Sequence, residues 1–258
     1  MKSPHIPFVF TLLAGLAAAG AQAQDKADGL WRGSGGAALS ASSGNTSSSS
    51  LQLAADLARA TADDRVTLAA TANRAQSRVA GVKTTSADKW AAAGQYDRNL
   101  SPQLFAFGRL GLEADQLVGL SLRSVVTTGL GYKLIKTEQT TFELLGGLGY
   151  TTDRYDSART IAGETARTFS RASVYLAEAS SHQLSPTVAF KQRLDLYPGV
   201  SGDKAVLAKF SAGLNVAMSD AMSLTVGLTH AYNSKPAPGT RSGDTGLFTG
   251  INVKFGAR

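Results

Sequence analysis

Residues 120–135 read LSLRSVVTTGLGYKLI, and apolar and polar side chains alternate along most of this stretch. One parity holds Leu122, Val126, Leu130, Tyr132 and Leu134, and the other holds Arg123, Thr127, Gly129, Gly131 and Lys133. A period of two is that of a β-strand, whose successive side chains point to opposite faces. Here one face suits an apolar medium and the other carries charge, which is typical of a strand in an outer-membrane barrel.

The same alternation recurs in residues 140–152, 205–218 and 245–256, and weaker forms of it divide the rest of the chain. Twelve strands are predicted, with approximate limits 31–43, 47–60, 65–78, 87–98, 103–114, 120–135, 140–152, 171–183, 187–197, 205–218, 222–232 and 245–256. We therefore predict an all-β fold, a transmembrane antiparallel up-and-down β-barrel of twelve strands. The rival fold is a soluble periplasmic β-sandwich, whose outer faces would be polar.

Two of these segments alternate poorly. In 103–114, Phe105 and Phe107 share the parity of Arg109. In 171–183, Val174 and Leu176 share the parity of Glu178. The strand limits in 31–78 and 171–183 are the ones that the pattern defines least.

Loop lengths predict the orientation of the barrel. An even number of strands places both termini on one side, which in outer-membrane barrels is the periplasm and carries the short turns. The connections predicted there are the tight ones, at 61–64, 99–102, 136–139, 184–186 and 219–221. Most outward connections are longer, at 79–86, 114–119, 153–170, 198–204 and 233–244. Gly44-Asn45 is the one tight turn expected on the outer side.

The first residues predict export. Lys2 precedes an apolar run from Ile6 to Ala19, and Ala21-Gln22-Ala23 supplies the small residues that signal peptidase requires. We predict a signal peptide over 1–23, a short tail over 24–30 and the barrel over 31–258. The run is shorter than the ~20 residues that span a bilayer as a helix, so cleavage near Ala23 and location in the Gram-negative outer membrane are expected.

Composition narrows the class of partner. The chain has 258 residues, a net charge of +7 and no cysteine, which excludes disulfides and thiolate chemistry. Loss of Lys2 with the signal peptide leaves a charge of +6, from 25 basic and 19 acidic residues. A basic balance favours anionic partners, but export and the absence of a basic cluster argue against nucleic acid.

Aromatic residues near the predicted strand ends indicate the two interfacial girdles of a membrane barrel. The inner girdle would contain Tyr96, Tyr132, Phe142 and Phe255, and the outer girdle Trp90, Tyr150, Tyr175 and Tyr232. The alternative is that aromatics occur there because they favour strands in general.

Charges on the interior parity predict a paired lumen, because a buried charge requires a partner. The predicted lumen cluster consists of Arg109, Glu113, Asp115, Arg123, Lys133, Glu143, Glu178, Lys191 and Arg193, and Asp195, Lys209 and Lys254 share its parity. The densest part pairs Glu113 and Asp115 with Arg109 and Arg123. A structural ion-pair network is the first interpretation, and a solute-contact site is the second.

Two histidines of the mature chain are candidates for enzymatic chemistry. His230 lies near an outer strand end, where a lipid-cleaving barrel would place its general base. Such an enzyme has a serine two residues after the histidine, but here that position is Tyr232, and Ser234 is four residues after His230. His182 shares its parity with Glu178 near a periplasmic turn, and metal binding would need more ligands. No catalytic residue, metal or other cofactor is therefore expected.

Several segments resemble a known family. They are GQYDRNLS (94–101), GLEADQLVGLSLR (111–123), GLGY (129–132), LAE (176–178), SHQLS (181–185) and YNS (232–234). On these the chain resembles the YdiY-like family, also labelled salt-induced outer membrane proteins, a domain family of unknown function, from about Gly33 to Phe255. The resemblance implies an outer-membrane barrel and brings no catalytic residues. One departure is that Phe255 is followed by three residues, whereas such barrels usually end on an aromatic residue.

The function expected is that of a monomeric outer-membrane barrel with a non-enzymatic, structural or stress-related role and at most a narrow passage for small solutes. A specific channel for small anionic solutes is the alternative, and a lipid-modifying enzyme is a third hypothesis. The expected partners are outer-membrane lipids, lipopolysaccharide and, during insertion, the barrel-assembly machinery.

Overall fold

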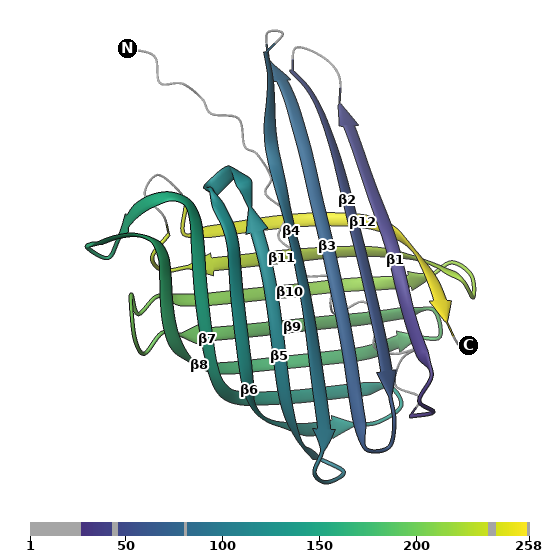
Figure 1. The fold of residues 1–258 in the computed structure, drawn as a ribbon. Coiled ribbons are helices and arrows are strands. Elements are labelled where there is room, and N and C mark those ends of the chain that lie inside the picture. The colour runs from purple at the N-terminus through teal and green to yellow at the C-terminus, as the bar shows by residue number, and fades with distance from the viewer. Residues whose placement is uncertain (1–26, 43–45, 80–81, 237–240, 257–258) are drawn as a thin grey trace.

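A computed structural model describes residues 27–42, 46–79, 82–236 and 241–256. Twelve antiparallel strands form one closed barrel in which each strand pairs with its neighbours in sequence and β1 pairs with β12 (Figure 1). The predicted fold class is confirmed, and closure excludes the two-sheet sandwich. Among the residues that the structure describes, no helix has the length and hydropathy needed to cross a membrane.

The strands follow the predicted limits closely, except around two outer connections. Their bounds are β1 Trp31–Ser42, β2 Thr46–Ala60, β3 Asp64–Val79, β4 Val82–Asn99, β5 Leu104–Asp115, β6 Leu120–Lys136, β7 Thr140–Ile161, β8 Glu164–Ser185, β9 Val188–Pro198, β10 Val206–Ala217, β11 Met222–Asn233 and β12 Gly243–Gly256. A short 3₁₀ helix, η2 (Gln116–Val118), joins β5 to β6. The predicted signal peptide and the Gly44-Asn45 turn lie outside the described residues.

The strand register separates the two faces as the alternation predicts. Arg123 on β6 stands opposite Glu113 on β5 and Asp153 on β7, so these three side chains share the inner face. The intervening side chains face outward, and among them Val126, Leu130 and Leu148 are about half exposed or more. The same separation holds on β10 and β12, where Leu214 and Ile251 are outward and Lys209 and Asn252 inward.

The two rims of the barrel differ. At the terminal rim, where β1 begins and β12 ends, neighbouring strands are joined by two to four residues. At the opposite, distal rim, β7 and β8 continue as a hairpin that projects beyond the neighbouring strands and curves over (Figure 1). The predicted outer loop 153–170 is therefore wrong, because most of it is strand. The predicted loop 79–86 is also wrong, since β3 and β4 leave only residues 80–81 between them.

The projecting hairpin has its own turn and its own small core. Ala162 (φ 52°) and Gly163 (φ 88°) form its turn, and positive φ at both central residues is what a type I′ hairpin turn requires. Below the turn, Tyr155 and Phe169 pack edge to face with their ring centroids 6.1 Å apart. Leu120 and Ile161 complete this buried cluster, which holds the hairpin against the start of β6.

Candidate functional site

The candidate site is the lumen of the barrel, whose wall contains a row of glycines where the largest side chains point inward. Gly131 on β6 stands opposite Phe105 on β5, and a Cβ atom added to it would lie 2.1 Å from the Phe105 ring. At Gly129 and Gly147 an added Cβ would lie 2.1 Å from backbone of the adjacent strand. Glycine is used in strands at such close approaches, and Gly131 leaves the volume that the Phe105 ring occupies.

An aromatic cluster fills the middle of the lumen. It consists of Phe105, Phe107, Tyr175 and Tyr197 together with Leu145, Ala177 and Leu207. The Tyr175 ring lies 5.6 Å from that of Phe107 and 5.0 Å from that of Tyr197, and its side chain has no exposed surface. Because the buried rings come from β5, β8 and β9, the cluster ties together strands from separate parts of the wall.

Polar groups at the edge of the aromatic cluster are satisfied by one another. The Tyr175 hydroxyl donates to Asp195 Oδ1 at 2.6 Å, and Arg193 Nη2 donates to the same hydroxyl at 2.9 Å. Arg193 also donates through Nε to Asp195 Oδ2 at 2.9 Å. A buried tyrosine hydroxyl usually has a partner, and here both the carboxylate and the guanidinium hold it in place.

Toward the terminal rim, an inner network crosses the lumen. Arg65 on β3 donates to Asp97 Oδ2 at 2.8 Å and to Glu143 Oε2 on β7 at 3.0 Å. Strands β3 and β7 are not neighbours, so the second contact spans the interior. The guanidinium of Arg65 and the ammonium of Lys133 lie 5.8 and 5.3 Å from the centroid of the Phe105 ring.

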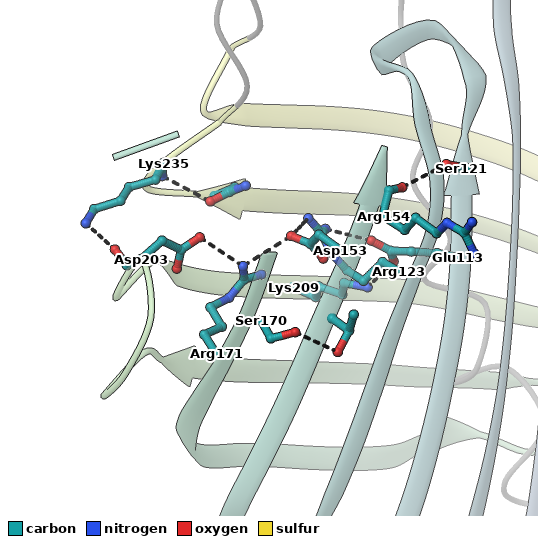
Figure 2. A network of polar contacts seen from close by, with 12 residues as sticks. Glu113, Ser121, Arg123, Asp153, Arg154, Ser170, Arg171, Asp203, Lys209 and Lys235 are labelled. Carbon is teal, nitrogen blue, oxygen red and sulfur yellow. Dashed lines mark hydrogen bonds and ion pairs between the residues drawn. The ribbon is translucent and has the colours of Figure 1, made fainter. Parts of the chain in front are cut away.

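Toward the distal rim, an outer network forms a second bridge (Figure 2). Arg123 donates to Glu113 Oε1 at 2.8 Å and to the two carboxylate oxygens of Asp153 at 2.5 and 2.9 Å. Lys209 on β10 donates to the other oxygen of Glu113 on β5. Because β5 and β10 lie on separate parts of the closed wall, the Lys209–Glu113 contact closes the network across the lumen.

The outer network continues to the distal connections. Arg171 Nη1 donates to Asp153 and to Asp203, at 3.1 Å in each case. Asp203 belongs to the segment between β9 and β10, and its backbone carbonyl accepts from Lys235 beyond β11 (Figure 2). The Arg171 ion pairs and the Lys235 hydrogen bond therefore fix these connections to the lumen wall.

Cavities remain between these layers. The distal vestibule has a volume of about 360 Å³ and is lined at the rim by Leu117, Val118, Pro236 and Arg241, and deeper by Lys89 and Glu113. The lumenal cavity below it has about 110 Å³ and is lined by Arg109, Thr127, Arg193 and Thr229, among others. Glu113, Arg123 and Lys209 line both cavities, so the outer network separates them.

The structure places most of the predicted lumen charges on the inner face. Arg123 and Glu113 pair as predicted, whereas Arg109 donates to Gln95 Oε1 at 3.2 Å. Asp115 accepts from the backbone N–H of Leu117 and so caps η2. The remaining inward members of the predicted cluster are Lys133, which donates to Asn99, Glu143, which binds Arg65, and Lys191 and Arg193 on β9.

Glu178 is a correction, because it does not face the lumen. Its neighbours Ala177 and Ala179 stand opposite the inward residues Asp195 and Arg193, so Glu178 belongs to the outer face with Val174 and Leu176. There it accepts from Gln192 Nε2 at 3.0 Å. The interior assignment was wrong because it followed the charge of the residue instead of the parity of its strand.

Tyr175 is a second correction. It was predicted in the outer aromatic girdle, but it is fully buried within the aromatic cluster of the lumen. The other girdle candidates lie on the outward parity, namely Trp90, Tyr96, Tyr132, Phe142, Tyr150, Tyr232 and Phe255. Whether they contact a membrane interface stays a prediction.

The histidines are held by structural contacts. His230 Nδ1 lies 2.8 Å from Thr245 Oγ1 on the outer face, and the Ser234 hydroxyl accepts from the backbone N–H of Val206 instead. His182 Nδ1 lies 3.4 Å from Thr140 Oγ1, and its ring stacks on that of Phe190. In the part of the chain that the structure describes, no group of three or more acidic or histidine side chains could hold a metal ion.

Six residues of the two networks escaped prediction. Two of them, Asp203 and Lys235, lie in the distal connections. Arg65 and Asp97 occupy the ends of their predicted strands, where parity counts for least. Asp153 is the first residue of the segment predicted as a loop, and Arg171 directly follows that segment. Extending the alternation Gly149, Thr151, Asp153 beyond residue 152 would have placed Asp153 inside. The arginine that stands opposite Thr151, Arg171, follows from the same register.

Comparison with family models identifies one family. A family model described as "Protein of unknown function, DUF481" matches residues 35–255. Comparison with curated proteins gave no match.

Solved structures with a similar fold are outer-membrane barrels of very different sequence. An outer-membrane channel from Pseudomonas putida F1 is 11% identical, with a TM-score of 0.49 over 96% of this chain and 100% of that chain. The NanC porin is 10% identical, with a TM-score of 0.45 over 88% of this chain and 97% of that chain. The CymD monoaromatic hydrocarbon channel is 8% identical, with a TM-score of 0.41 over 89% of each chain.

Proposed function

The chain belongs to the family described as "Protein of unknown function, DUF481", and we propose that it is an outer-membrane barrel with a closed lumen and a non-enzymatic role in the envelope. That role is structural or stress-related, and it does not include the free diffusion of solutes that an open porin allows. The observation that carries this proposal is the pair of ion-pair networks that cross the interior, Lys209–Glu113 and Arg65–Glu143.

The outward face supports the membrane location. Its exposed side chains come from strands all round the barrel and include Leu53, Leu68, Leu110, Leu148, Leu214 and Ile251. Soluble monomers rarely expose contiguous apolar surface larger than a few hundred Å². Lipid is the solvent that makes such a face stable, and aromatics at both ends of the band suit the two interfaces.

Burial of the inward face supports closure. Polar or charged inward side chains with less than a tenth of their surface exposed occur on β1, β4, β9, β11 and β12, as Arg32, Asp97, Lys191, Thr225 and Asn252. The wall of a water-filled pore would leave such groups accessible to solvent. A barrel of twelve strands lies between those filled by side chains and those that enclose a channel, and the ion pairs and rings that cross this lumen favour the first kind.

Orientation and assembly follow from the same geometry. The terminal rim, with its short turns, would face the periplasm, and the distal rim with the projecting hairpin would face lipopolysaccharide. Because closure leaves no unpaired strand edge among the described strands, the barrel needs no second copy to complete its sheet. We therefore expect a monomer that depends on the barrel-assembly machinery for insertion and on the lipids of the Gram-negative outer membrane thereafter.

Conductance in planar lipid bilayers tests the closed lumen. We expect the wild-type barrel to insert without conductance steps, and a Glu113→Ala, Lys209→Ala variant to remain silent because the aromatic cluster lies below the outer bridge. Adding Phe105→Ala and Tyr175→Ala to that variant should produce steps, since both layers are then truncated. Porin-like steps from the wild type would refute the closed lumen.

The second candidate function is a specific channel for small anionic solutes. The two stacked cavities favour it, because the same three side chains, Glu113, Arg123 and Lys209, line both of them. A movement of these side chains would join the two cavities. On this alternative the outer network opens when a solute arrives, and the wild type conducts only when that solute is present. Steps that appear in an organic anion salt but not in potassium chloride would select the channel over the closed barrel.

A further inference from the structure

We propose that the distal vestibule is a binding site for a small carboxylate that also carries hydroxyl or amine donors, and that the Lys89 ammonium is its anchor. This inference rests on the proposed function in one respect, namely that the outer network forms a floor beneath the vestibule. The site lies on the distal side of the barrel, and a ligand can bind there without passing through the lumen.

The vestibule has the size and the position of a ligand site. Its volume of about 360 Å³ falls within the range of roughly 300–1,000 Å³ that is usual for small-molecule pockets. Residues of the distal connections line it, including Leu117 and Val118 of η2 and Arg241 and Ser242 before β12. A solute on the distal side therefore meets this cavity first.

Lys89 is the unusual group in the vestibule. It lies on the inward parity of β4, opposite Asp115 on β5, and only 8% of its surface is exposed. Its Nζ atom is buried and has no hydrogen-bond partner among the residues that the structure describes. Leaving a buried charged donor unsatisfied costs more than the 1–3 kcal/mol of a neutral group, so an acceptor supplied by a ligand would be strongly favoured.

The other cations of the vestibule floor are already engaged. Arg123 binds both Glu113 and Asp153, and Lys209 binds the second oxygen of Glu113. Glu113 is therefore neutralised from two sides and offers nothing to Lys89. The Lys89 ammonium is the cation of this floor whose donors remain available to a bound carboxylate.

Two carboxylates near Lys89 define what else the ligand must carry. Asp115 stands opposite Lys89 in the strand register, and Asp115 and Asp244 both line the vestibule. Asp115 uses Oδ1 to cap η2, which leaves acceptor capacity directed at the cavity that it lines. A bare anion would be repelled by Asp115 and Asp244, whereas a ligand with donors beside its carboxylate binds the lysine and hydrogen-bonds these two residues.

Calorimetric titration of the purified barrel in detergent tests this site, with gluconate as the probe and sorbitol as its uncharged counterpart. We expect heat of binding with gluconate and none with sorbitol. Lys89→Met should weaken gluconate binding about tenfold or more, since it removes a charge-assisted hydrogen bond. Lys83→Met is the matched control, because Lys83 is an exposed lysine of the same strand. The Lys83→Met variant should bind gluconate with the affinity of the wild type.

Folding of each variant is checked by the heat-dependent shift of its band in electrophoresis. Lys89→Met should stay folded, because it replaces an unsatisfied buried ammonium by an apolar side chain of similar length. The proposal is overturned if the wild type does not bind gluconate, if sorbitol binds equally well, or if folded Lys89→Met binds as tightly as the wild type. Absence of binding in a silent barrel refutes this inference alone, whereas porin-like conductance with intact binding refutes the proposed function alone.

Discussion

Single glycines decide where the rings of the lumen fit. Phe105 and Phe107 appeared to break the alternation of their strand, because apolar side chains shared a parity with Arg109. Glycines stand opposite both rings, Gly131 opposite Phe105 and Gly129 opposite Phe107, and at Gly131 an added Cβ would collide with the Phe105 ring. The sequence shows both sets of residues, but the pairing that joins them requires the strand register.

Gly131→Ala should therefore destabilise the barrel. The added methyl group would lie 2.1 Å from the Phe105 ring, and overpacking of this kind typically costs about 1–3 kcal/mol. Gly146→Ala is the control, because nothing lies within 4 Å of the added Cβ. Urea-induced unfolding in lipid vesicles measures both free energies, and equal values for the two variants would contradict the packing described.

Arg65 is the residue on which the inner network depends. Replacement by Met would leave Asp97 and Glu143 buried without their cation, and breaking a buried ion pair costs about 3–5 kcal/mol. Arg98→Met on the neighbouring strand removes only an exposed contact with Asp63 at 3.9 Å, which should cost about 0–1 kcal/mol. The same unfolding assay should give a larger loss of unfolding free energy for Arg65→Met than for Arg98→Met. Equal losses would show that the inner network does not stabilise the barrel.

At the scale of elements, the alternation predicted the strands well and their outer ends poorly. Within β6 both faces were assigned correctly, because lipid-facing and lumen-facing residues differ sharply there. Beyond Thr152 the outward side chains of β7 become polar, as Arg154 and Asp156, so the contrast between the faces disappears although the pairing continues. The pattern reports the medium around a strand, and it therefore ends before the strand does.

Epitope insertion tests the orientation of these elements. A tag between Ala162 and Gly163 lies at the tip of the projecting hairpin, and one between Ser219 and Asp220 lies in a turn of the terminal rim. We expect antibodies to bind the first tag on intact cells and the second only after the outer membrane is permeabilised. The reverse pattern would show that the distal rim faces the periplasm.

At the scale of the whole molecule, the barrel reverses the arrangement of a soluble protein, with apolar side chains outside and paired charges and rings inside. The sequence predicted this arrangement and the presence of interior charge. It did not predict which charges meet, because partners such as Glu113 and Lys209 are 96 residues apart and come together only on closure.

The outward face makes a prediction for stability in lipid. Leu148 lies on the outer face of β7 between Phe142 and Tyr150 and is 67% exposed. Leu148→Arg should cost about 2–4 kcal/mol in a bilayer, as arginine does near the midplane, whereas Val82→Arg at the distal end of β4 should cost about 0–1 kcal/mol. Unfolding in lipid vesicles gives both values, and a negligible cost at Leu148 would argue against lipid contact.

Crosslinking across the lumen tests the central claim most directly. The chain has no cysteine, so a Glu113→Cys, Lys209→Cys variant carries two thiols at the outer bridge, and a short bifunctional thiol reagent can join them where a disulfide would require closer backbones. A Glu113→Cys, Leu214→Cys variant is the control, since Leu214 faces outward on the same strand as Lys209. The account predicts an intramolecular crosslink in the first variant and none in the control. Failure to crosslink the first variant, while each of its thiols still reacts with a monofunctional reagent, would contradict a lumen bridged by ion pairs.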